Sequence, residues 1–175
     1  GFTFDYAGAS RQFVTESGAL AATFALALAV IYLLLAAQFE SFRDPLVILV
    51  TVPLSICGAL IPLFLGFATL NIYTQVGLIT LIGLISKHGI LVVEFANHLR
   101  QDKGLTARQA VEEAAAIRLR PILMTTAAMV FGMLPLLMAS GAGAVSRFDI
   151  GLVIATGMSI GTLFTLFVLP AIYIL

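Results

Sequence analysis

Apolar positions fill most of the chain, and polar positions interrupt them in clusters rather than in a regular alternation. Four long runs contain no Asp, Glu, Lys or Arg: residues 17–39, 45–86, 121–146 and 150–175. A helix needs about 20 apolar residues to cross the hydrocarbon core of a bilayer. Because the second run is long enough for one span and most of another, the pattern predicts five transmembrane helices.

The predicted fold is an all-α, polytopic membrane bundle. Asp44 and Pro45 fit the N-cap and first residue of its second helix, since the missing N–H of proline costs nothing there. Pro53 and Pro62 are expected to kink that helix. We place the five helices at about residues 18–37, 46–66, 73–97, 121–139 and 150–175.

The segment between the third and fourth helices has a different pattern. Thr106 and Gln109 fit a capping box, and Arg108 and Glu112 are spaced as an i, i+4 pair. The following residues form an apolar stripe on one helix face. The segment therefore predicts one short interfacial helix at about residues 106–119.

Basic residues predict the orientation of the helices. Six lie in the first and third connections and two on the opposite side. Because Lys and Arg are enriched in cytoplasmic connections, we expect a periplasmic N-terminal end and a cytoplasmic C-terminus. The six are Arg43, Arg100, Lys103, Arg108, Arg118 and Arg120, and the two are Arg11 and Arg147.

Residues 1–17 precede the first apolar run and differ from it. Phe2, Phe4 and Tyr6 alternate with other residues, which is typical of a strand. The chain also does not begin with Met. We therefore expect this segment to be the end of a larger periplasmic domain, and the chain to be a fragment.

Composition supports a membrane protein and argues against nucleic acid as a partner. Of the 175 residues, 61% are hydrophobic and 10% charged, against roughly 25% charged residues in soluble domains. The nine basic residues are balanced by nine acidic ones, so there is no basic excess to bind a phosphate backbone. Membrane lipid is the expected surrounding, and nucleic acid is not an expected partner.

Lys87 is the strongest functional signal, because it lies about 15 Å along the predicted helix from Asn97, near the middle of the membrane. An unpaired ammonium there costs about 2.5 kcal/mol or more. Glu94 lies two turns further on nearly the same face, so both side chains are expected to point into the protein. The alternatives are a permanent structural ion pair for Lys87 and simple solvation for Glu94 near the cytoplasmic surface.

Arg118 and Thr125 form a second candidate pair, seven residues apart on the fourth helix. A threonine hydroxyl both donates and accepts hydrogen bonds and can pass one along. Taken alone, however, a threonine such as Thr125 more often packs in the bundle with its hydroxyl bonded to a carbonyl of its own helix. An arginine such as Arg118 more often anchors the helix end at the cytoplasmic surface. No buried Asp is expected in the five spans.

The fifth helix contains Gly157-Met-Ser159-Ile-Gly161, which allows two interpretations. The pattern G-x-S-x-G occurs in serine hydrolases, but there it requires a strand, a sharp turn and a helix. Gly157 and Gly161 also form a small-residue face for helix packing, which we favour over an intramembrane serine hydrolase. Glu94 and His98 lack a third ligand with suitable spacing, so neither a metal site nor a cofactor is predicted.

The order of several motifs resembles the last helices of resistance-nodulation-division (RND) efflux permeases. The resemblance covers essentially the whole chain, as helices eight to twelve of a twelve-helix permease. The motifs are GLISKHGILVVEFA at residues 83–96, RLRPILMT at 118–125, QFESFRDP at 38–45 and FGMLPL at 131–136.

The resemblance implies a proton antiporter rather than an enzyme. Lys87 matches a lysine that neutralises two aspartates in the N-terminal half of the permease and is released when they take up protons. Arg118 and Thr125 match the proton path, and Glu94 matches an acid of secondary role. It also implies drugs or other amphiphiles as substrates, with metal or lipid export as the alternative.

The resemblance further implies partners for the whole permease. These are the N-terminal half of the same chain, two further copies in a homotrimer, a periplasmic adaptor and an outer-membrane channel. The expected location is the inner membrane. Because the aspartate pair and the drug-binding region would lie outside this sequence, the chain by itself is not expected to transport anything.

Overall fold

The computed structural model describes the backbone of residues 7–174 and, from Ala22 onward, the side chains. Within this part the chain forms helices joined by short loops and contains no strand, which confirms the all-α prediction. Five segments are long and apolar enough to span a membrane, α2 and α3 counting together as one. The helices are α1 (Ala9–Phe39), α2 (Arg43–Leu49), α3 (Thr51–Phe64), α4 (Ile72–Lys103), α5 (Ala107–Leu137) and α6 (Ala144–Ile174).

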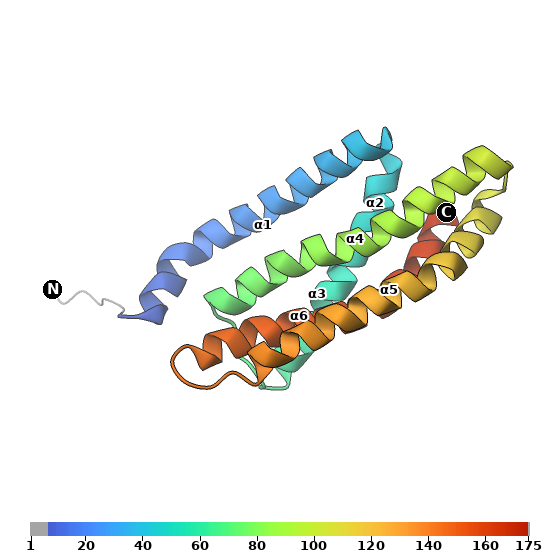
Figure 1. Ribbon diagram of the computed structural model, residues 1–175. Helices are drawn as coiled ribbons and strands as arrows, with labels where there is room; N and C mark the ends of the chain where they lie inside the picture. Colours follow the sequence, from blue (N-terminus) through green and yellow to red (C-terminus); the bar gives the residue numbers. More distant parts are fainter. Residues whose placement is uncertain (1–6, 175) are drawn as a thin grey trace.

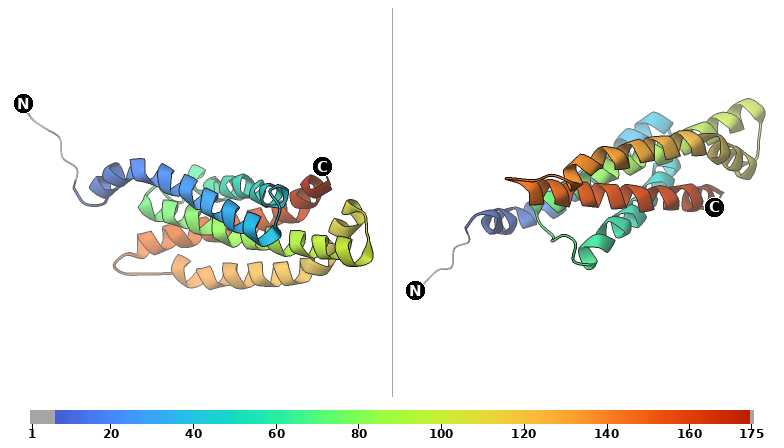
Figure 2. Two further views of the ribbon diagram at one scale, coloured as in Figure 1. Left: turned by 90° about the horizontal axis from the view of Figure 1, so that it is seen from above. Right: turned by 60° about the horizontal axis from the view of Figure 1, so that its bottom comes forward.

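Helix α6 packs against α2, α3, α4 and α5, whereas α1 packs, within the described part of the chain, only against α2 and α4 (Figures 1 and 2). The helices alternate in direction, so the connections gather at two ends. We call the end with residues 40–42 and 104–106 the basic end, because Arg43, Arg100 and Lys103 lie there. The end with residues 65–71 and 138–143 is called the opposite end.

The core consists of two apolar clusters along α6. The cluster toward the basic end joins α6 to α2, α4 and α5, and the other joins α6 to α3 and α4. Helices α4 and α2 approach each other closely at Gly89 of α4, where an added Cβ would collide with the Ile48 side chain of α2. Small residues of this kind allow membrane helices to pack at short distances.

The second predicted span differs from expectation at its start, whereas near Pro53, where a kink was expected, the helix is indeed interrupted. Asp44 and Pro45 are not its cap and first residue: the helix begins at Arg43, and Asp44 lies in the first turn, where a carboxylate is favourable. The interruption lies at Val50, between α2 and α3. Pro53 explains the interruption, since it has no N–H for the carbonyl of Leu49. Helix α3 continues through Pro62 to Phe64.

The segment predicted as a separate interfacial helix at residues 106–119 is instead the first part of α5. The capping box of Thr106 and Gln109 and the Arg108–Glu112 ion pair are both confirmed. However, the helix continues past Pro121. A single proline removes only one backbone hydrogen bond, which a membrane helix tolerates.

At the N-terminal end, α1 already begins at Ala9, although the first helix was expected from about residue 18. The predicted span began after the charged residues Arg11 and Glu16, because it was placed on a charge-free run. The helix itself includes both residues. The expected strand at Phe2, Phe4 and Tyr6 lies outside the described residues.

Candidate functional site

One face of α4 is uncovered along the whole helix. The exposed positions recur every three or four residues, apart from one gap at 90–91, where the side chains are half-buried. This spacing marks one side of a helix, as in the seam of a coiled coil. We call this face the α4 stripe; it consists of Tyr73, Val76, Thr80, Gly83, Lys87, Glu94 and His98.

Lys87 and Glu94 both belong to the α4 stripe. Their side chains are exposed, and within the described residues neither forms an ion pair or a hydrogen bond. The expectation that they point into the protein is therefore not met within this chain. The physical reason is that α3 and α6 pack on the other face of α4, which leaves the stripe free.

His88, the residue after Lys87, lies on the covered face and is fully buried. Its Nε2 atom is 3.5 Å from the Thr125 hydroxyl of α5, and its Nδ1 atom is 3.4 Å from the Thr162 hydroxyl of α6. The hydroxyls of Thr126 and Thr162 are 3.1 Å apart. We call these four residues the His88 cluster, which joins α4, α5 and α6.

The hydrogen bonds of the His88 cluster can be oriented so that every threonine hydroxyl proton has an acceptor. The Thr125 hydroxyl donates to the carbonyl oxygens of Pro121 and Ile122, each at 3.0 Å, so it accepts from the Nε2–H of His88. The Nδ1 atom then accepts from Thr162, which accepts from Thr126. The network thus assigns a neutral imidazole with its proton on Nε2.

Arg118 is half-buried between α4 and α5 rather than simply extended as a cytoplasmic anchor. Its guanidinium lies over the Phe95 ring, 4.6 Å from the centroid, in a cation–π contact. Its Nε atom is buried without a hydrogen-bond partner. No described hydrogen bond or ion pair joins Arg118 or Thr125 to Lys87 or Glu94.

Gly157 and Gly161 lie in the middle of α6, where the neighbouring helices come closest. A Cβ added at Gly157 would collide with Leu81 of α4, and one at Gly161 with Ser55 of α3. Ser159 donates to its own-helix carbonyl at Ala155, 2.8 Å away. The strand and sharp turn that a serine-hydrolase nucleophile requires are absent here, because α6 is continuous.

Asp149 is a buried carboxylate at the opposite end, 2% exposed, which sequence reasoning missed. We expected no buried Asp, because Asp149 was placed just outside the fifth span, whereas α6 begins five residues earlier. Its Oδ2 atom accepts a hydrogen bond from the amide nitrogen of Asn71. Asn71 is also the N-cap of α4, so this contact ties the start of α4 to α6.

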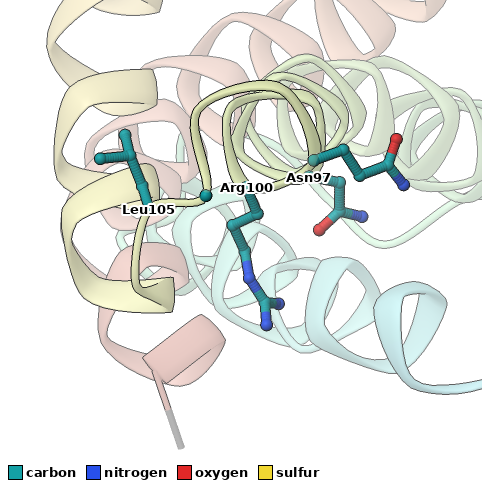
Figure 3. A pocket seen from close by; sticks show the side chains of 5 residues that line it. Asn97, Arg100 and Leu105 are labelled. Carbon is teal, nitrogen blue, oxygen red and sulfur yellow. The ribbon is translucent and has the colours of Figure 1, made fainter.

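A second polar network lies at the basic end. Asn97 of α4 donates to Asp44 of α2 at 2.6 Å and accepts from the Tyr173 hydroxyl of α6. Beside it, Arg100 projects from α4 next to the turn that leads to Leu105 (Figure 3). A cavity of about 410 Å³ is formed there by Asn97, Arg100, Gln101, Gly104 and Leu105.

The described residues contain no group of three or more His, Cys, Asp or Glu side chains that could hold a metal ion. The site residues therefore fall into two groups. Lys87 and Glu94 lie on the uncovered α4 stripe, whereas Thr125 belongs to the buried His88 cluster.

The chain is similar to known transporters over nearly its whole length. The model of the AcrB/AcrD/AcrF family matches residues 1–175. An uncharacterized transporter of Haemophilus influenzae is 60% identical over 99% of the chain. The multidrug resistance protein MdtF of Escherichia coli K12 is 38% identical and the solvent-resistant pump transporter SrpB of Pseudomonas putida 39% identical, each over 99% of the chain. The chain spans about 17% of the length of these relatives.

Proposed function

The chain belongs to the AcrB/AcrD/AcrF family of RND efflux transporters, and we propose that it forms the C-terminal membrane half of a proton-driven transporter. Its function is then the export of drugs or other amphiphilic compounds by proton antiport. Two relatives are named as a multidrug resistance protein and a solvent-resistant pump, which supports amphiphiles rather than metals or lipids as substrates.

The observation on which this proposal rests is the position of Lys87. It is residue 16 of the 32 in α4, a helix long and apolar enough to span the membrane. A cation at that depth needs an anionic partner, and no described residue supplies one. The α4 stripe is therefore suited to receive a membrane helix with acidic side chains from the rest of the protein.

In this mechanism, proton uptake changes the partner of Lys87. Carboxylates of the N-terminal half hold the ammonium while they are ionised, and protonation removes their charge. Lys87 then favours a new arrangement of α4, and the helix movement couples proton flow to export. Thr125 and Arg118 provide the path from the basic end, and Glu94 has a secondary role.

The proposed location is the inner membrane, with the basic end in the cytoplasm. This orientation follows from the six basic residues in the connections at that end. The C-terminus is then cytoplasmic and the N-terminal end periplasmic. The family resemblance adds a homotrimer, a periplasmic adaptor and an outer-membrane channel as partners.

The test is Lys87→Ala in the full-length protein, with drug efflux measured in cells and proton flux measured in proteoliposomes. We expect efflux to fall to the level of cells without the transporter, because the acids lose their counter-charge. Lys103→Ala is the matched control, since Lys103 is an exposed lysine paired with Glu113 outside the apolar part of α4. It should retain efflux.

Expression and membrane insertion of Lys87→Ala should equal those of the wild type, because the Lys87 side chain is exposed and forms no ion pair among the described residues. Wild-type efflux by a correctly inserted Lys87→Ala protein would refute the proton-relay role.

A further inference from the structure

A cavity of about 400 Å³ opens at the opposite end of the bundle, between the loop 65–71, the end of α5 and the start of α6. This volume lies within the roughly 300–1,000 Å³ of small-molecule sites. Its lining is mostly apolar and contains a single charged side chain, Asp149. The lining residues are Gly66, Phe67, Ala68, Thr69, Ala139, Ala144, Val145, Phe148 and Asp149.

Asp149 is 98% buried by its neighbours, yet its only described partner is the neutral side-chain amide of Asn71. The nearest cation in sequence, Arg147, forms no described ion pair with Asp149. Its guanidinium donates to the carbonyl oxygens of Ala142 and Gly143 instead. Within the described residues, Asp149 therefore has no positive counterpart.

A carboxylate removed from water is costly unless it is paired with a cation or saturated with hydrogen bonds. An ionised carboxylate has about four lone-pair positions that can accept hydrogen bonds. The single amide N–H of Asn71 therefore leaves most of the acceptor capacity of Asp149 unused. A positive charge that enters from the cavity would supply a counter-charge and use this remaining acceptor capacity. The aromatic and aliphatic lining requires that this charge be attached to an apolar body.

We infer that this cavity binds a monovalent organic cation with an apolar body, and that Asp149 is the residue that pairs with its charge. The aromatic rings of Phe67 and Phe148 suit such a ligand, because ring faces attract cations as well as apolar groups. The site is separate from the proposed proton relay: Lys87 lies in the middle of α4, and Asn71 caps its first turn.

The competing explanation is a purely structural one, in which Asp149 only orients Asn71. The amide oxygen of Asn71 accepts from the backbone N–H groups of Tyr73 and Thr74, and Asp149 holds the other side of the same amide. A structural contact of this kind predicts a change in thermal stability but no ligand binding. The two explanations therefore differ in what equilibrium binding should show.

The experiment is equilibrium dialysis of the full-length, detergent-solubilised protein with phenyltrimethylammonium, and with tert-butylbenzene as its uncharged isostere. We expect the cation to bind the wild type about tenfold or more tightly than it binds Asp149→Asn. The isostere should bind both proteins equally weakly. Glu112→Gln, which removes an exposed carboxylate at the basic end, should leave binding of the cation unchanged.

Ala68→Trp is the second variant, because it fills the cavity from the loop and leaves Asp149 and Asn71 in place. It should lower the affinity for the cation by the same factor of about ten or more, even if Asp149→Asn fails to fold. Wild-type affinity of either variant for the cation, or equal affinity of the wild type for the cation and its isostere, would overturn the proposal. Dialysis needs no proton gradient, and Lys87→Ala should bind the cation as the wild type does. The binding result is therefore independent of whether the proposed proton relay is correct.

Discussion

Helices α1 and α6 have the same length and the same hydropathy, yet they are packed very differently. Each has 31 residues and a best window of mean hydropathy 2.1. Half of the α6 window is buried, against 6% of the α1 window between Ala22 and Phe39. Hydropathy therefore indicates that a helix enters the membrane, and something else determines how closely it packs.

Glycine at the contact positions is one difference between the two helices, since the described part of α1 has alanines but no glycine from Ala22 onward. Helix α6 has glycine at 151, 157 and 161, all buried against α3, α4 or α5. The described part of α1 instead exposes large side chains, including Leu26, Leu33 and Leu34. Lipid is as apolar as leucine, so large apolar side chains give no net drive toward a neighbouring helix, whereas small ones allow close contact.

The strongest test of this comparison is Gly161→Ala. The added methyl group would collide with Ser55 and Ile85, and α3 or α4 would have to move. We expect the full-length protein to lose about 1–3 kcal/mol of stability, measured by thermal unfolding in detergent. Gly132→Ala in α5 is the matched control, because no atom lies within 4 Å of its added Cβ.

The control should be neutral or slightly stabilising, since alanine favours a helix by about 1 kcal/mol over glycine. Equal losses of stability in the two variants would mean that α6 does not depend on close approach at Gly161.

A smaller effect is expected for Thr162→Val, which keeps the shape of the side chain but removes its hydroxyl. The Nδ1 atom of His88 then loses its described partner between α4 and α6. The expected loss is about 1 kcal/mol, in the range measured for hydrogen bonds between membrane helices. Thr156→Val is the control, because the Thr156 hydroxyl donates to the carbonyl of Leu152 in its own helix.

If both threonine variants unfold at the same temperature, the His88 cluster does not stabilise the bundle. The same pair can be compared for efflux. Because Thr125 is both a member of the cluster and a proposed relay residue, Thr162→Val should slow efflux more than Thr156→Val does.

The smallest effect is expected for Leu33→Ala in α1, where 62% of the leucine side chain is exposed. Exposed substitutions usually change stability by less than about 0.5 kcal/mol. Thermal unfolding of the full-length protein is again the measurement. A loss of 2 kcal/mol or more would contradict the comparison, because it would require another part of the protein to cover this face of α1.

The features that the sequence predicted correctly depend on neighbouring residues. The four apolar runs predicted five spans, and five segments of the described chain are long and apolar enough to span a membrane. The capping box at Thr106 and Gln109 and the pair of Arg108 and Glu112 depend on spacings of three and four residues. Local backbone geometry fixes such contacts, so they do not require knowledge of the packing.

The features that it missed depend on residues far apart in the chain. His88 meets Thr162 across 74 positions, and Asn71 meets Asp149 across 78. Periodicity could not identify these buried faces, because the helices are apolar on nearly all sides and polar residues do not mark the outside. The sequence offers one signal for the His88 cluster, a histidine next to Lys87 within an apolar helix, and we did not use it in predicting the site.

Helix α5 has a mechanical consequence, because it is continuous from Ala107 to Leu137. At 1.5 Å per residue it is about 46 Å long, some 16 Å more than the hydrocarbon core. The excess acts as a rigid lever: a tilt of about ten degrees in the membrane displaces its outer end by about 3 Å. Lys103 and Glu113 form an ion pair between α4 and α5 at that end, so a tilt of α5 would move the hairpin turn as well.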